Sequence, residues 1–170
     1  MAGRGLVVAL VAGLAGFGLA GGAPWGRAGA AEAGPADAGP AEAAPAPQYL
    51  NADPNTTAPF SDAVRFGPML YLSGQLGLDA DGKLVPGGIT PESQRAMENL
   101  KGTLERNGSS LDRVVSCLLL LADIRDREAF NAVYQKYFGQ GRFPARSAIG
   151  TSGLYIGARV EISCTAVVKG

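Results

Sequence analysis

Two short segments near the C-terminal end of the chain carry side chains whose types and positions suit chemistry on a small acid. In RFPARS, residues 142–147, Arg146 follows a proline at the expected start of a strand. Its guanidinium is a planar fork of donors that matches a carboxylate in two parallel hydrogen bonds. In RVEIS, residues 159–163, Glu161 lies on a second strand. On adjacent strand ends, Arg146 and Glu161 would together hold a small acid and activate a water. The alternative is an ordinary surface arginine and glutamate.

The overall composition excludes several other kinds of chemistry. The chain has 170 residues, of which 46% are hydrophobic and 18% charged, and it contains no histidine. Histidine triads, histidine metal sites and imidazole acid–base catalysis are therefore excluded. The two cysteines have no CxxC spacing and cannot form a zinc site alone, so no metal is expected. The formal net charge is zero, which gives a nucleic-acid partner no electrostatic support.

The first 47 residues are expected to lie outside the folded domain. A short positive start precedes an apolar run over residues 6–20 and an A-x-A pattern at 28–30. This layout predicts a secretory signal peptide over residues 1–30, and hence export to the periplasm or the extracellular space. An uncleaved membrane anchor is the alternative, although the apolar run is short and rich in glycine. Residues 31–47 are rich in Ala, Pro and Gly, which predicts a disordered linker.

Residues 48–170 form the predicted domain, which is long enough for a single core. Strands are expected at 63–66 and 69–75, followed by an Asp-Gly turn at 79–82. The continuous apolar run 114–122 predicts a buried central strand. The last strand, from residue 159, alternates apolar and polar side chains.

Two helices are expected between these strands. Thr90 is predicted to cap the first helix, with Pro91 at its first position and Asn107-Gly108 at its end. Asp126 is predicted to open the second helix, which carries an apolar stripe. The stripe consists of Phe130, Val133, Tyr134, Tyr137 and Phe138. The order β-β-α-β-α-β-β predicts an α+β fold, a sheet with two helices on one face.

The two cysteines both fall on apolar segments. Cys117 lies in the run 114–122, and Cys164 lies on the apolar face of the last strand. Free cysteines in such positions usually pack as small hydrophobic side chains. An exported location would instead allow a disulfide between them, and the spacing alone does not decide.

Six segments in order along the domain resemble a known family. They are PFSDAV (59–64), YLSGQ (71–75), PESQRAMENL (91–100), FNAVYQKYF (130–138), FPARSA (143–148) and VEI (160–162). Together they resemble the Rid family, the YjgF-type imine/enamine deaminases. The resemblance covers nearly all of residues 55–170.

The resemblance implies a chorismate-mutase-like α+β fold and a homotrimer with sites between subunits. It also implies hydrolysis of 2-imino or enamine acids to 2-oxo acids and ammonia, with no metal or organic cofactor. By matching position, Arg146 would bind the substrate carboxylate and Glu161 would orient the attacking water. Ser73 and Gly74 would line the site, and Asn131 would contribute to the pocket.

The sequence departs from the family pattern at two positions near the expected site. Phe60 stands where the family usually has tyrosine, so a hydroxyl is lost, and Ala148 stands where cysteine is common. These changes leave open a non-catalytic trimer of the same fold that binds small carboxylic acids. Within such a site Glu161 would pair with Arg146, Ser73 would cap a strand and Asn131 would be a surface or interface residue. A holdase-like role is a third possibility, which no feature of the sequence favours.

Overall fold

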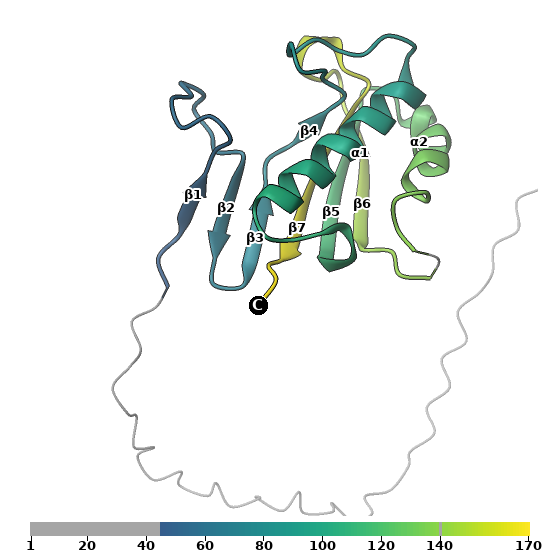
Figure 1. Ribbon diagram of the computed structural model, residues 1–170. Coiled ribbons are helices and arrows are strands. Elements are labelled where there is room, and N and C mark those ends of the chain that lie inside the picture. The colour runs from purple at the N-terminus through teal and green to yellow at the C-terminus, as the bar shows by residue number, and fades with distance from the viewer. Residues whose placement is uncertain (1–44, 140) are drawn as a thin grey trace, which may run out of the picture. The chain divides into compact units, whose positions relative to one another are not determined.

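The computed structural model describes residues 45–139 and 141–170. The expectations for the signal peptide and for most of the linker therefore lie outside the described residues. In the described part of the chain, seven strands form one sheet in the order β1-β2-β3-β7-β5-β6, with β4 also paired to β7 (Figure 1). The strands are β1 Gln48–Leu50, β2 Ala63–Phe66, β3 Met69–Leu72, β4 Gln75–Leu76, β5 Val114–Leu121, β6 Ala145–Gly150 and β7 Val160–Val167.

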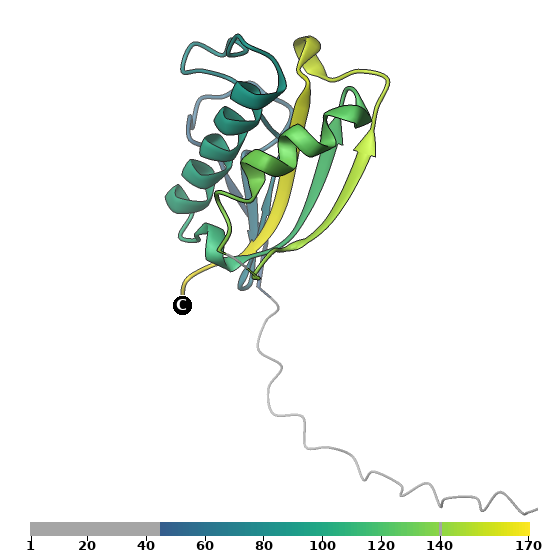
Figure 2. The same cartoon turned by 90° about the vertical axis from the view of Figure 1, so that its right-hand side faces the viewer.

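Two helices cover one face of this sheet, as Figure 2 shows from the side. They are α1 Ile89–Arg106 and α2 Arg127–Tyr134, and α1 packs against α2, β4 and β7. β5 and β6 are parallel neighbours with α2 between them in sequence, whereas the other pairings are antiparallel. The mixed α+β fold with both helices on one face is thus confirmed. No helix among residues 45–139 and 141–170 has the length and apolar character needed to cross a membrane.

The hydrophobic core lies between the sheet and the helices. Its fully buried side chains include Leu70, Met97, Leu100, Leu104, Leu119, Leu121, Phe130, Val133, Val160 and Ile162. The predicted alternation along the last strand is confirmed, because every second residue of β7 from Val160 is buried. This alternation turns Glu161 away from the helices, toward the opposite face of the sheet.

The helix boundaries differ from the predicted ones. The first helix begins at Ile89 after Gly88, whose φ of 82° suits glycine, so Thr90 is not the cap and Pro91 is the third helical residue. Proline is tolerated there because the N–H groups of the first turn have no partner within the helix. Asp126 does precede α2, but α2 ends at Tyr134. Tyr137 and Phe138 therefore follow the helix, although Phe138 still packs in the core.

Two strand predictions also need correction. The expected strand 69–75 is divided at Ser73-Gly74 into β3 and β4. The edge strand β1, which pairs antiparallel with β2, was not predicted. Its three residues, Gln48–Leu50, are too few for a periodic pattern to indicate a strand. The Asp-Gly turn is confirmed, since Gly82 N–H donates to the Asp79 carbonyl at 3.1 Å.

The central strand β5 is buried on one face only. Cys117, Leu119 and Leu121 face the helices and are buried, whereas Leu118 points to the other face and is 38% exposed. The prediction of a strand buried on both faces is therefore wrong for a single chain. Exposed Tyr71 and Ile149 lie on the same uncovered face. We call this the open face of the sheet.

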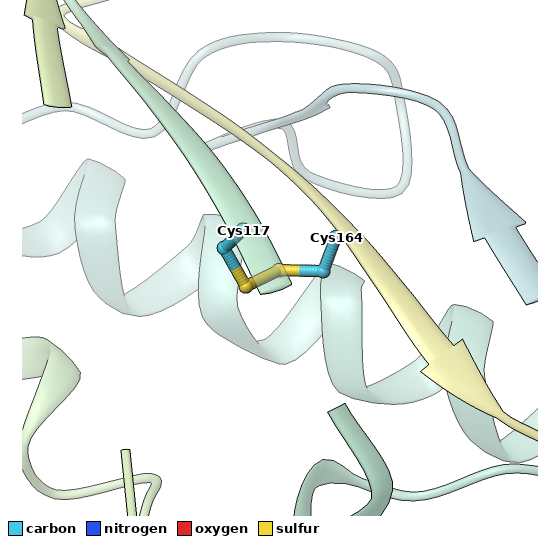
Figure 3. The surroundings of a disulfide bond; sticks show 2 residues. All are labelled: Cys117 and Cys164. Atoms are coloured by element: carbon cyan, nitrogen blue, oxygen red, sulfur yellow. A yellow bond between two sulfur atoms is a disulfide. The ribbon is translucent and has the colours of Figure 1, made fainter. Parts of the chain in front are cut away.

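Cys117 and Cys164 form a disulfide on the helix side of the sheet (Figure 3). The two residues are direct partners in the β5–β7 ladder, with their Cα atoms 4.1 Å apart. This short separation is typical of a non-hydrogen-bonded antiparallel pair and is what brings the sulfur atoms together. The question that the sequence left open is answered by the strand register.

Candidate functional site

A first pocket surrounds Arg146 at the edge strand β6. The cavity is about 330 Å³ and is lined by Asn131, Tyr134, Gln135, Phe143, Pro144 and Arg146. We call it the arginine pocket. Arg146 is the register partner of Cys117 on β5, so its side chain points to the helix side of the sheet and meets α2.

The Arg146 guanidinium is held by neutral groups. Its Nη2 donates to the Asn131 Oδ1 at 2.6 Å. Its Cζ lies 4.4 Å from the ring centroid of Tyr134 and 5.5 Å from that of Phe130. Aromatic faces attract a cation without neutralising it. Among the described residues no ion pair involves Arg146, so its positive charge is fixed in place and still available to an anion.

Two buried donors at this pocket lack partners. The Arg146 Nη1 and the Tyr134 hydroxyl are both buried without a hydrogen bond within the described chain. Burial raises the pKa of the Tyr134 phenol, and the nearby Arg146 charge partly opposes this rise. An unsatisfied buried donor is costly, and a bound carboxylate would relieve that cost. The local arrangement therefore favours an anionic ligand.

A second pocket surrounds Glu161 on β7. The cavity is about 570 Å³ and is lined by Ala58, Phe60, Ser73, Gly74, Leu76, Tyr155 and Glu161. We call it the glutamate pocket. Its lining comes from the loop before β2, the segment that joins β3 to β4 together with β4 itself, the loop after β6, and β7.

The Glu161 carboxylate lies directly against Gly74. A Cβ atom added at Gly74 would be 2.6 Å from the Glu161 Cδ, which is far inside van der Waals contact. Only glycine therefore leaves room for this position of the carboxylate. No hydrogen bond in the described part of the chain involves the Glu161 carboxylate, so its oxygens are free to accept hydrogen bonds from a ligand or a water.

Ser73 has a structural bond as well as a place in the glutamate pocket. Its hydroxyl donates to the Ser61 carbonyl at 2.6 Å, and its N–H donates to the Asp62 carbonyl at 3.0 Å. These bonds tie the end of β3 to the loop that carries Phe60. The hydroxyl oxygen keeps lone pairs that can accept a further hydrogen bond.

Arg146 and Glu161 do not meet within one chain. β6 and β7 are not adjacent, as the sequence interpretation supposed, because β5 pairs with both. Two strand spacings correspond to about 10 Å across the sheet. The two side chains also point to opposite faces. Arg146 with Asn131 forms one group, and Glu161 with Phe60, Ser73 and Gly74 forms another.

Sequence interpretation missed several side chains that line these pockets, and two of them, Tyr134 and Tyr155, have a hydroxyl group. Tyr134 was assigned to the core, where it does lie, but its ring also carries the Arg146 guanidinium. The helical periodicity of apolar residues placed Tyr134 in the core, but this periodicity does not indicate a contact with Arg146. Tyr155, in the loop after β6, was not considered at all. An exposed aromatic residue in a Gly-rich loop was the only available signal for it.

The chain matches the family model described as Endoribonuclease L-PSP over residues 50–168. The chain belongs to this family, that of the Rid or YjgF-type proteins. The goat protein named 2-iminobutanoate/2-iminopropanoate deaminase is 45% identical over 115 residues, which cover 67% of this chain and 83% of that protein. The yeast protein HMF1 is 38% identical over 123 residues, covering 72% and 95%.

Solved structures of family members share the fold. A protein from Entamoeba histolytica described as a putative endoribonuclease L-PSP superposes with a TM-score of 0.67 at 37% identity, and the match covers 72% of this chain and all of that chain. A Yersinia pestis member of the conserved Rid protein family superposes with a TM-score of 0.68 at 32% identity, covering 72% and 100%. The family fold thus corresponds to the described domain.

Proposed function

We propose that this Rid-family protein hydrolyses 2-imino or enamine acids to 2-oxo acids and ammonia. Relatives named 2-iminobutanoate/2-iminopropanoate deaminase are 45%, 44% and 43% identical to it over 115 residues. The observation that carries the proposal is the guanidinium of Arg146, which is held by Asn131 and forms no ion pair among the described residues. A 2-imino acid places a carboxylate next to an electrophilic C=N carbon, so a cation that binds the carboxylate also positions that carbon.

Arg146 would bind the substrate carboxylate. Its Nη2 is oriented by Asn131 and its plane by the rings of Tyr134 and Phe130. Because the Nη1 has no hydrogen-bond partner among the described residues, binding would satisfy a donor instead of displacing an existing bond. Fixing the carboxylate in this way supplies the proximity part of catalysis.

Glu161 would hold and activate the water. Its ionised carboxylate accepts a proton from the water as the water oxygen bonds to the carbon of the protonated imine, which gives a carbinolamine. Return of that proton to the nitrogen makes it a leaving group. The C–N bond then breaks as the carbinolamine hydroxyl gives its proton to Glu161, so that ammonia leaves and the 2-oxo acid forms. Ser73 and Gly74 would line the substrate on this side. These steps need one water and one proton carrier, and we propose that they require neither a metal nor an organic cofactor.

We further propose that two copies of the chain complete each site, in a homotrimer. Arg146 and Glu161 face opposite sides of the sheet, so one substrate cannot reach both in one chain. The open face with Tyr71, Leu118 and Ile149 supports association, because exposed apolar sheet faces are usually covered by a partner. A ring of heterologous contacts would bring the arginine pocket of one copy to the glutamate pocket of the next.

We also propose that the protein is exported. The disulfide between Cys117 and Cys164 supports this location, since disulfides persist mainly in oxidising compartments. A direct check is the location and the N-terminal residue of the mature protein in its own cells. Protein that stays in the cytoplasm with both thiols free would contradict the proposal.

The test of the proposed reaction measures imine loss in the oxidised full-length protein. An amino-acid oxidase would generate 2-iminopropanoate in place, and semicarbazide would trap what remains. We expect the wild type to accelerate imine loss and Arg146→Ala and Glu161→Gln to lose this activity at least about 100-fold each. Arg146→Lys keeps the charge but not the fork, so it should recover only part of the activity.

The alternative function is a trimer that binds small carboxylic acids without turning them over. The missing hydroxyl at Phe60 is the observation that favours it. No acceleration by the wild type, together with carboxylate binding that depends on Arg146, would establish this alternative. Full turnover by Arg146→Ala would show instead that the site is wrongly assigned.

A further inference from the structure

We propose that Tyr155 supplies the phenolic hydroxyl that the glutamate pocket lacks at Phe60, and that this hydroxyl helps to orient the attacking water. The inference rests on the proposed deaminase function and adds a residue that the family resemblance does not assign. It starts from one fact of the structure: Phe60 and Tyr155 line the same cavity as Glu161.

The side chains of the glutamate pocket offer few hydrogen bonds to a ligand. Ala58, Phe60, Gly74 and Leu76 have no polar side-chain atom. The Ser73 hydroxyl already donates to the Ser61 carbonyl, and an ionised Glu161 only accepts. Tyr155 is therefore the side chain of this lining that still has a donor to offer, since no hydrogen bond in the described residues involves its hydroxyl.

The turn that carries Tyr155 is held at both ends. Before it, the Thr151 N–H donates to the Leu121 carbonyl at 2.8 Å. After it, the Arg159 N–H donates to the buried Glu92 carboxylate at 2.8 Å. In Figure 1 this turn lies at the top of the sheet, between the ends of β6 and β7. Tyr155 is thus carried by a short segment whose two anchors lie on fixed elements.

The backbone next to Tyr155 adopts a costly conformation. Ile156 has φ 49° and ψ 24°, in the left-handed region, which is rare for a β-branched residue. Such a residue carries backbone strain and persists only where its surroundings enforce it. Buried Ala158 and the anchored ends provide that enforcement. The side chain of the neighbouring Tyr155 is 72% exposed. Packing of the Tyr155 ring therefore does not explain the conformation of Ile156.

A phenol in this position complements the carboxylate of Glu161. A water that donates one hydrogen to Glu161 can accept the Tyr155 O–H on one lone pair, which leaves its other lone pair directed at the imine carbon. The phenol stays neutral and protonated throughout, so no proton is gained or lost at Tyr155. Because Arg146 alone would bind the carboxylate, removing this hydroxyl should lower kcat and leave KM nearly unchanged.

The experiment compares Tyr155→Phe in the wild type and in a Phe60→Tyr background. We expect Tyr155→Phe to lower kcat for imine hydrolysis about 10-fold in the wild type, as the loss of one hydrogen bond in the transition state predicts. With a hydroxyl restored at position 60, the same change should lower kcat less than about 2-fold. Tyr49→Phe is the matched control, because Tyr49 is also 72% exposed and lies on β1, outside both pockets.

Three results would overturn the inference. An unchanged kcat in Tyr155→Phe, measured on an active wild type, removes the role of the hydroxyl while the deaminase function stands. An equal loss of kcat in both backgrounds shows that Tyr155 does not stand in for the hydroxyl missing at Phe60. An inactive wild type overturns the proposed function, and the role of Tyr155 with it. An unaltered thermal midpoint in each variant ensures that kcat is compared between folded proteins.

Discussion

The arginine pocket and the glutamate pocket are built in opposite ways. The side chains of the arginine pocket all come from residues 131–146, on α2, the following turn and β6. Those of the glutamate pocket come from four segments spread over residues 58–161. The arginine pocket is formed by one local supersecondary unit, which holds a positive charge. The glutamate pocket forms only where segments distant in sequence meet beside β7. Under the proposed mechanism, this difference means that substrate binding and water activation depend on separate parts of the fold.

The largest effect should come from recombining the two pockets. Arg146→Ala keeps an intact glutamate pocket, and Glu161→Gln keeps an intact arginine pocket. If each site uses one pocket from each of two neighbouring copies, co-expressed variants should regain about one quarter of wild-type activity per site, as random mixing in a closed ring predicts. Imine hydrolysis by the purified mixture measures this recovery.

The control for this experiment mixes the two variants after each has assembled alone. That mixture should stay inactive unless subunits exchange. No recovery on co-expression, with mixed oligomers verified by two different affinity tags, would mean that no site uses one pocket from each copy. The proposed shared site would then be wrong.

A smaller but still large effect is expected at Gly74. Gly74→Ala forces the Glu161 carboxylate to move, because the new Cβ would lie 2.6 Å from its Cδ. A displacement of about 1 Å at a reacting group can cost about 100-fold, so kcat should fall by that order. Carboxylate binding at the arginine pocket should persist. Gly139→Ala, where an added Cβ meets nothing within 4 Å, is the matched control, and equal activity of the two variants would refute the close approach.

The same contrast explains how much of the site could be predicted from sequence. The FPARS segment and Asn131 are close in sequence, and their contact follows from one β5–α2–β6 unit. The relation between Arg146 and Glu161 depends on strand order, and no local pattern shows that β5 lies between their strands. The apolar run of β5 predicted burial on both faces, because a sequence does not distinguish a covering helix from a covering partner. The loop position of Tyr155 has no periodicity from which a contact could be inferred.

An intermediate effect is expected at Asn131, within the arginine pocket. Its amide oxygen accepts from Arg146 at 2.6 Å without adding charge. Asn131→Ala removes one hydrogen bond to a charged group and should raise KM about 10-fold with little change in kcat. Asn131→Asp should raise KM further, because the new carboxylate would neutralise Arg146 and compete with the substrate. Asn55→Asp, an exposed site in the loop after β1, controls for the added charge. A lower KM in Asn131→Asp would contradict anion binding here.

The disulfide lies between the strands of the two pockets but should matter least for activity. Cys117 is the register partner of Arg146, and Cys164 is three residues from Glu161 on the same strand. The β5–β7 ladder already fixes this arrangement, since its pairing runs from Val114 to Leu121. The bond therefore constrains the unfolded chain more than it shapes the folded site.

Reduction should accordingly lower stability and leave kcat within about 2-fold. A cross-link between residues 47 apart is expected to contribute about 2–4 kcal/mol to the free energy of unfolding. Urea unfolding with and without reductant measures this difference, and Cys117→Ala/Cys164→Ala should show no response to the reductant. An unchanged urea midpoint in the reduced wild type would mean that the bond constrains little. A large loss of kcat with an unchanged free energy of unfolding would mean instead that the disulfide positions the two pockets. The strand ladder alone would then not hold them in place.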